Sequence, residues 1–122
     1  MTRPAVLDGP PEQPPLATGR RCAECPAHFA PRDAKQLFCG IPCKRAYNNR
    51  WLTRGAVLAP IYTAARVTRG GSRGDKAIGR KARQAAEQLV QRWIEEDAAA
   101  GRLDAVAYVA HRLRHGLLEV LR

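Results

Sequence analysis

The sequence has no long hydrophobic run and few aromatic residues. None of its apolar stretches approaches the roughly 20 residues that a membrane-spanning helix needs. Aromatic side chains make up 6% of the 122 residues, against 45% for all hydrophobic types, so a core would consist mainly of Ala, Leu, Val and Ile. Residues 1–15 contain no apolar segment of the kind that directs secretion. We therefore expect a cytoplasmic chain, in a reducing compartment where clustered cysteines bind metal more often than they form disulfides.

Acidic residues are scarce over most of the chain. Lys and Arg total 21 against 11 Asp and Glu, which gives a net charge of +10. The excess is segregated, because residues 20–54 and 55–84 each carry +6 whereas residues 85–122 carry −1. Concentrated positive charge attracts polyanions. The charge pattern therefore suggests a nucleic-acid partner, although it says little about the fold.

The four cysteines form two pairs. Two residues separate Cys22 from Cys25, three separate Cys39 from Cys43, and thirteen lie between the pairs. Two intervening residues let both thiolates of a pair turn toward one ion, and four sulfur ligands leave no position for water, as in structural zinc sites. We predict one structural Zn²⁺ held by all four cysteines. Two disulfides and four free thiols are the alternatives, and His28 is a less favoured ligand.

The residues around the cysteines predict short secondary-structure elements. Pro42 suits the first turn of a helix because its fixed φ is helical and its missing N–H is not needed there, so Cys43 is expected in the first turn of a helix that ends near Gly55. Phe29 and Leu37–Phe38 flank a polar segment and predict a β-hairpin over the metal site. A knuckle, a hairpin and a helix that carries the last ligand form a treble clef.

The motif CAEC…LFCGIPCKRAYNNRW resembles the short bacterial and phage zinc fingers of the FCS/MYM-like treble-clef type. The resemblance covers about residues 21–51, and a more distant likeness is to the small zinc-containing gyrase inhibitors of bacteria. Two positions depart from the pattern, since Pro26 replaces the usual Gly and Gly40 the usual Ser. The positions that match are Cys22, Cys25, Phe29, Pro31, Phe38, Cys39, Cys43, Arg45, Ala46, Tyr47 and Arg50.

Helical periodicity predicts a helical hairpin over residues 75–122. Asp75 can cap the first helix and Gly101 can end it. The second helix is expected from about Asp104 through Leu121, and the two apolar stripes can pack against each other in antiparallel fashion. The stripes comprise Ile78, Ala82, Ala85, Leu89 and Trp93 in the first helix, and Val106, Val109, Ala110, Leu113, Leu117 and Val120 in the second.

The expected fold is therefore a small, α-rich α+β protein. Residues 1–19 form a disordered proline-rich tail, and residues 20–54 form the treble-clef zinc finger. Residues 55–74 form a basic connector that is partly helical, with a helix interrupted or begun near Pro60 and a flexible glycine-rich end. Residues 75–122 form the C-terminal helical hairpin.

The basic residues after the cysteines are candidates for phosphate contacts. Two alternatives stay open: cations offset the charge of the thiolates, and arginine is common throughout this chain. Tyr47 and Trp51 lie four residues apart on one helix face, which favours core packing over base stacking. The candidate nucleic-acid-binding residues are Lys44, Arg45, Arg50, Arg54, Arg66, Arg69, Arg73, Lys76, Arg80, Lys81 and Arg83.

No arrangement typical of an enzyme is found in the sequence. His111 and His115 lie four residues apart but lack the glutamate of the metalloprotease motif, so both are interpreted as surface histidines. A treble-clef nuclease would need a catalytic histidine and a metal-binding set, and only His28, Asn48 and Asn49 are near. We expect a non-enzymatic regulatory or accessory factor that contacts nucleic acid, with DNA favoured over RNA.

The alternative is an adaptor or inhibitor that docks on an enzyme or assembly through the zinc finger or the helical hairpin. The hairpin could also mediate self-association, because so small a chain buries little apolar surface. Salt separates the two hypotheses, since phosphate binding weakens log-linearly with salt. Charge reversal at Arg80, Lys81 and Arg83 should abolish nucleic-acid binding and spare an apolar interface.

Overall fold

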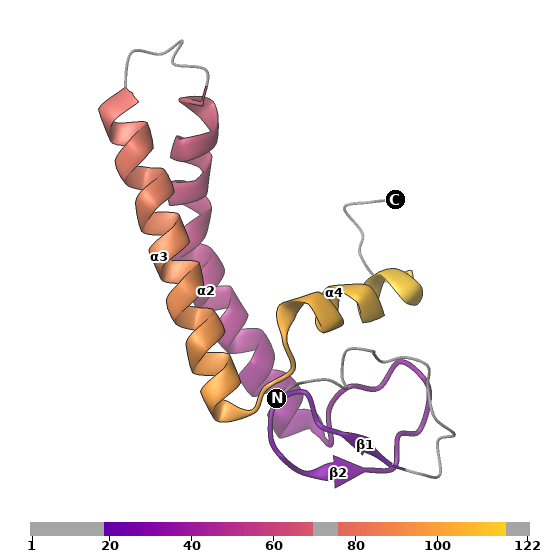
Figure 1. Ribbon diagram of the computed structural model, residues 1–122. Helices are drawn as coiled ribbons and strands as arrows, with labels where there is room; N and C mark the ends of the chain where they lie inside the picture. Colours follow the sequence, from indigo (N-terminus) through magenta and orange to yellow (C-terminus); the bar gives the residue numbers. More distant parts are fainter. Residues whose placement is uncertain (1–18, 70–75, 117–122) are drawn as a thin grey trace. The chain divides into compact units, whose positions relative to one another are not determined.

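The computed structural model describes residues 19–69 and 76–116, with three helices and a two-stranded antiparallel sheet (Figure 1). Its contacts divide the chain into two units, Met1–Arg45 with Asp97–Arg122, and Ala46–Glu96. None of the described helices is long and apolar enough to cross a membrane. The features predicted outside the described residues are the tail up to residue 18, the glycine-rich linker, Arg73, the Asp75 cap, Leu117 and Val120.

In the first unit, the strand pair brackets the first cysteine pair. Strand β1 (Arg20–Arg21) pairs with β2 (His28–Phe29), with Arg20 opposite Phe29. The sequence predicted that Phe29 would pair with Leu37–Phe38, and the structure differs. The carbonyl of Leu37 instead accepts a hydrogen bond from Ala23 N at 2.8 Å, so this segment is tied to the knuckle and not to β2.

Polar side chains hold the segment between β2 and Cys39 without a second strand pair. Gln36 Oε1 accepts from the backbone N–H of Arg32 at 2.7 Å, and Asp33 Oδ1 accepts from that of Lys35 at 2.8 Å. Side chains that satisfy nearby backbone groups stabilise turns at the expense of strand pairing. The polar residues that suggested the tip of a hairpin therefore form a side-chain-supported loop.

Helix α4 (Ala105–Arg114) packs on this loop in the first unit. It begins after Asp104, close to the predicted start, and Asp104 Oδ1 caps it by accepting from Ala107 N at 2.8 Å. It ends at Arg114, earlier than the sequence predicted. Its buried residues are Ala107 and His111, and His111 Nε2 lies 3.1 Å from the carbonyl oxygen of Lys35. The interpretation of His111 as a surface histidine is therefore wrong, since only 3% of it is exposed.

Helix α2 (Ile41–Val67) runs without interruption over 27 residues. Cys43 lies in its first turn, as predicted, but the helix neither ends near Gly55 nor breaks at Pro60. Gly55 does not have the positive φ of a helix-ending glycine. Pro60 lacks the N–H of one intrahelical bond, and the buried Ala65 anchors the helix beyond it.

In the second unit, α2 lies alongside α3 (Lys76–Ala100) in antiparallel fashion (Figure 1). Gly79 is buried against Thr68, so closely that a Cβ there would overlap the threonine side chain. In this unit the stripe of α3 therefore packs on α2, whereas the sequence predicted packing on the helix that follows. The boundary at Gly101 was predicted correctly, since α3 ends at Ala100 and Gly101 has φ +73°.

The segment after α3 is fixed by backbone hydrogen bonds within the first unit. Arg102 N donates to the carbonyl of Asp97 at 2.9 Å, and Leu103 N donates to that of Ala23 at 3.0 Å. The carbonyl of Gly101 accepts from Arg21 Nη2 at 2.9 Å. Backbone hydrogen bonds of this kind leave no hydrophobic pattern in the sequence. The sequence therefore did not indicate that the chain returns to the knuckle here.

Candidate metal centre

The four cysteines converge in the first unit. Their Sγ atoms all lie within 4.8 Å of one another. Cys22 follows β1 directly, Cys25 ends the knuckle, Cys39 precedes α2 and Cys43 lies in its first turn. The structure therefore brings together all four predicted ligands, and the cluster could hold a metal ion. The fifth candidate, His28, is exposed in β2 and is not part of the cluster.

The sulfur spacing suits a tetrahedral ion. A Zn–S bond of about 2.3 Å in a tetrahedron requires sulfurs about 3.8 Å apart. The Sγ atoms of Cys25 and Cys39 are separated by 3.8 Å, and those of Cys39 and Cys43 by 3.6 Å. All four donors are soft sulfur atoms, which select zinc, copper(I) or iron–sulfur centres over magnesium or calcium.

Backbone N–H groups converge on the most buried sulfur. Cys22 is 2% exposed, and its Sγ accepts from Glu24 N at 3.4 Å and from Cys39 N at 3.3 Å. Burial raises the pKa of the Cys22 thiol, but these N–H groups outweigh the effect and lower its pKa to about 7. The site thus prepares one thiolate before any ion binds.

The thiol of Cys43 does not ionise as easily. Desolvation and the contact with Cys39 raise the pKa of the Cys43 thiol above its usual range. Four negative charges this close repel one another strongly, so a cation is needed to keep all four deprotonated. Metal binding would therefore release protons, and the affinity for the metal would be lower in acid.

The knuckle is supported by segments far away in the sequence. Ala23 is 2% exposed, its N–H donates to Leu37 and its carbonyl accepts from Leu103. Arg20 Nη1 donates to the carbonyls of Ala34 and Gln36, at 3.1 and 2.7 Å. The sequence predicted no role for these residues, because a backbone contact at such separation leaves no pattern in the residue types.

The predicted nucleic-acid-binding residues fall into two groups. Arg54 is 5% exposed, with its Cζ 4.7 Å from the Trp51 ring centroid and 5.3 Å from that of Trp93. Its Nη2 lies 3.4 Å from Glu96 Oε1, so it is not placed for phosphate contact. Arg50 is half-buried, 5.5 Å from the Tyr47 ring. The exposed members are Lys44, Arg45, Arg66, Arg69, Lys76, Arg80, Lys81 and Arg83.

Two aromatic residues of α2, Tyr47 and Trp51, belong to the packing of the second unit. Tyr47 is 4% exposed, and its ring centroid lies 6.3 Å from that of Trp51. Trp51 is half-buried beneath Arg54. The expected interior packing is confirmed for Tyr47, whereas Trp51 is only half-buried.

Comparison with protein-family models, curated proteins and solved structures finds no match to this chain. The four-sulfur cluster is therefore the strongest indication of function. The order of its ligands, with two in a knuckle and the fourth in the first turn of a helix, is compatible with a zinc finger.

Proposed function

We propose that the chain is a non-enzymatic zinc-binding protein that contacts nucleic acid, DNA in preference to RNA, as a regulatory or accessory factor. The observation that carries the proposal is the convergence of four cysteine Sγ atoms within 4.8 Å. Four thiolates occupy every position of a tetrahedral zinc ion and leave none for a substrate. The ion would accordingly stabilise the fold and take no part in a reaction.

The proposed family is the FCS/MYM-like treble-clef finger. Its support is the matching motif together with the knuckle after β1 and the helix that carries Cys43. The short strand pair lies across the knuckle and not between the cysteine pairs. The proposal therefore rests on the ligand order and not on the hairpin that the sequence suggested.

The nucleic-acid part of the proposal rests on charge in the second unit. Six exposed cations lie in the last turns of α2, just after it and in the first turns of α3, where Thr68 and Gly79 meet. Helix α2 contains no acidic residue, and the first in α3 is Glu87. Among the residues that the structure describes, no acid is interspersed with these cations, which suits phosphate contacts. The six are Arg66, Arg69, Lys76, Arg80, Lys81 and Arg83.

The metal is tested by native mass spectrometry of protein purified without added metal. We expect one zinc ion per chain, lost from the Cys22→Ser variant and retained by Ala30→Ser, an exposed position of the same unit. A chain that carries iron or copper would contradict zinc specifically. A chain without metal, with all four thiols reactive, would overturn the proposal.

Nucleic-acid binding is tested by titrating labelled duplex DNA at several salt concentrations. Each phosphate contact adds about −0.9 to the slope of log K against log salt. The Arg80→Glu/Arg83→Glu variant should lose most of the affinity and flatten the slope. Arg92→Glu is the matched control, since Arg92 is exposed on the acidic half of α3. Binding that is independent of salt, or equal losses in both variants, would contradict a phosphate-contacting surface.

The adaptor remains the second candidate, because one observation favours it. Several large apolar side chains of the second unit are exposed, among them Tyr62 at 53% and Ile78 at 60%. Exposed apolar groups that lie together mark interaction surfaces more often than chance would give.

A further inference from the structure

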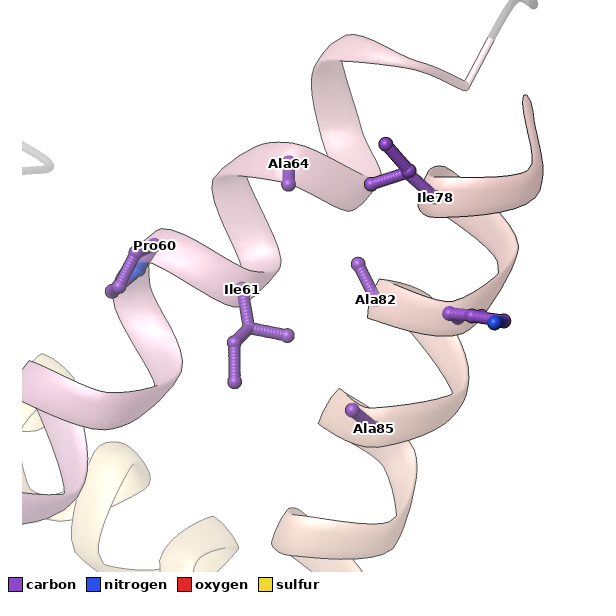
Figure 2. Close-up of a pocket in the computed structure, with 7 residues that line it drawn as sticks. Pro60, Ile61, Ala64, Ile78, Ala82 and Ala85 are labelled. Atoms are coloured by element: carbon purple, nitrogen blue, oxygen red, sulfur yellow. The ribbon is translucent and has the colours of Figure 1, made fainter. Parts of the chain in front are cut away.

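Each unit holds a feature that the proposed function leaves unused. In the second unit it is an apolar hollow of about 400 Å³ between α2 and α3, where Ile61 and Ala64 face Ala82 and Ala85 (Figure 2). Nothing in the part of the chain that the structure describes shows what covers this hollow. In the first unit it is the unequal exposure of the four cysteines, which determines where a solute can reach the cluster.

Cys39 is the most accessible member of the cluster. It is exposed, whereas Cys25 and Cys43 are half-buried and Cys22 is 2% exposed. Its Sγ contacts Cys25 Sγ at 3.8 Å and Cys43 Sγ at 3.6 Å, and both contacts lie at the surface. The Sγ of Cys22, in contrast, accepts hydrogen bonds from the backbone N–H groups of Glu24 and Cys39. A solute therefore reaches Cys39 first and Cys22 last.

A loaded site would also hold Cys39 in its reactive form. A bound zinc ion keeps its thiol ligands deprotonated, and the thiolate is the form of cysteine that reacts with peroxides. When all four sulfurs are deprotonated, access and not acidity decides which of them reacts first. The neighbouring Sγ of Cys43 is 3.6 Å away, so a small shift of its segment would bring it to the S–S bond length of about 2.05 Å.

We propose that the metal centre is a redox switch, in which hydrogen peroxide oxidises Cys39, Cys43 completes a disulfide with it, and the ion is released. The inference rests on the proposed function, because it assumes that the four cysteines hold the ion. A disulfide between Cys39 and Cys43 removes two of the four ligands. The first unit should then unfold as it does on chelation, whereas the second keeps its packing.

The reaction balances with hydrogen peroxide as the only oxidant. The Cys39 thiolate attacks one peroxide oxygen, the O–O bond breaks, and uptake of one proton gives a sulfenic acid and water. The Cys43 thiol then attacks the sulfur of this sulfenic acid, the S–O bond breaks, and a second water leaves with the thiol proton. Two thiols thereby lose two electrons to the peroxide.

Cys43 is the expected partner in preference to Cys25. Its sulfur lies slightly closer to that of Cys39, and three residues separate the two along the chain, against thirteen between Cys25 and Cys39. The entropy lost in closing a loop grows with its length. The first turn of a helix also opens more easily than its interior, so Cys43 can follow Cys39.

Hydrogen peroxide is added in steps to the full, zinc-loaded chain. A colorimetric chelator measures the released zinc, and dimedone traps sulfenic acid in a parallel sample. We expect one zinc ion released per disulfide formed, and dimedone labelling of Cys39 at least about tenfold above that of Cys22. Equal labelling of Cys39 and Cys22, or zinc that stays bound after Cys39 has reacted, would overturn the proposal.

Peptide mapping identifies the disulfide. Trypsin cleaves after Lys and Arg, so each cysteine pair stays within one peptide, residues 22–32 and residues 36–44. A Cys39–Cys43 disulfide leaves the second peptide lighter by two hydrogen atoms, whereas a Cys25–Cys39 disulfide joins the two peptides. Joined peptides as the main product, or a disulfide between two chains, would overturn the proposal.

Cys43→His and Cys25→His form a matched pair of variants. Each replaces one thiol by another side chain that binds zinc, and native mass spectrometry checks that the ion is retained. Cys43→His should accumulate the sulfenic acid of Cys39, whereas Cys25→His should form the Cys39–Cys43 disulfide as the parent does. Equal accumulation of sulfenic acid in both would contradict the pairing. If either variant loses its ion, the peptide map of the parent chain decides.

Two further measurements complete the test. Dithiothreitol and added zinc should restore the loaded chain, because a disulfide is reducible and a sulfinic or sulfonic acid is not; irreversible loss of zinc binding would overturn a switch. The zinc content before oxidation separates this inference from the proposed function. A chain that carries no zinc contradicts the proposed function, whereas a loaded chain that reacts first at Cys22, or keeps its ion in peroxide, contradicts the switch alone.

Discussion

The two units of the chain are held together in different ways. In the first, the buried residues include Cys22, Ala23 and His111, and they are fixed by hydrogen bonds to sulfur and to backbone carbonyls. In the second, Tyr47 and Arg54 are buried among aromatic rings, and Gly79 allows two helices to meet. The first unit therefore depends on ligands and directional contacts, whereas the second depends on side-chain packing.

The largest expected effect concerns the first unit alone. Structural zinc contributes on the order of 10 kcal/mol to the folding of small zinc domains. Removing the metal with a chelator, or replacing Cys22 by Ser, should therefore unfold the first unit. In ¹H–¹⁵N correlation spectra, the amide signals of residues 19–45 should lose their dispersion.

The second unit is the internal control for metal removal. Its side-chain packing does not include the cysteines, so the dispersed signals of Ala46–Glu96 should persist after chelation. Loss of dispersion in both units together would show that the packing of the second also depends on the metal. Unchanged signals at residues 19–45 would contradict a structural role for the ion.

The next largest effect concerns Arg54. Its guanidinium lies over the Trp51 and Trp93 rings, and only 5% of the residue is exposed. Arg54→Ala should lower the free energy of unfolding by about 2–3 kcal/mol, through lost packing and lost cation–π contact. Thermal unfolding followed by circular dichroism measures the change.

Glu96→Gln separates packing from ion pairing at the same place. The Glu96 side chain is 53% exposed, and its pair with Arg54 spans 3.4 Å. Half-exposed pairs contribute about 0–1 kcal/mol, so this variant should cost much less than Arg54→Ala. Equal losses would show that the ion pair, and not the aromatic contact, holds Arg54.

Substitution by alanine should have opposite effects at two glycines of the second unit. Gly79→Ala should cost about 1–2 kcal/mol, because the added methyl overlaps Thr68, whose hydroxyl is held by the carbonyl of Ala64 at 2.9 Å. Gly55→Ala should stabilise α2 by up to about 1 kcal/mol, since nothing lies within 4 Å of the new methyl. Urea unfolding measures both.

Thr68→Ala tests the cause of the Gly79 effect. Removing the hydroxyl and Cγ2 of Thr68 relieves the closest overlap, but the Cβ at position 68 stays 2.8 Å from the new methyl, so the double variant should recover part of the loss. If Gly79→Ala is as destabilising in the Thr68→Ala background as in the parent chain, the overlap is not the cause. If Gly55→Ala also destabilises, helix propensity is not what distinguishes the two positions.

The metal unit was easier to predict than the pairing of the helices. Cysteine spacing encodes the ligand set directly, and Pro42 placed Cys43 in a first helical turn, as the structure has it. Periodicity predicted the helix of residues 76–100 and its end before Gly101. A stripe shows that a face will be buried but not by which neighbour, so the packing of α3 on α2 was missed.

The errors share a physical cause. Gly55 and Pro60 were interpreted by their intrinsic preferences, and the packing of α2 overrides both. His111 was interpreted as exposed because its partner is a backbone carbonyl, that of Lys35, which no residue pattern reveals. The burial of Arg54 was missed for a similar reason, because its aromatic partner Trp93 lies 39 positions away in the sequence.

The smallest expected effect is a pH dependence that belongs to the first unit. Burial lowers the pKa of His111 below its usual value, and electrostatic repulsion from His115, Arg20 and Arg114 lowers it further, against the opposing hydrogen bond to Lys35. The unfolded chain takes up a proton near pH 6.5, whereas the folded chain does so only in stronger acid. The contribution of His111 to the free energy of unfolding is therefore complete above pH 6.5 and declines as the pH falls below that value.

Acid also weakens metal binding, so the parent chain alone cannot isolate His111. The measurement is the difference in unfolding free energy between the metal-loaded parent and His111→Gln, taken at several pH values. This difference should shrink as the pH falls from 7 toward 5, because the parent alone loses the contribution of a neutral imidazole. His28→Gln, at an exposed position of β2, should keep the pH dependence of the parent. A difference that is constant with pH would mean that His111 stabilises the first unit through packing alone. The polar contacts that stabilise this unit would then be those of its cysteines and backbone.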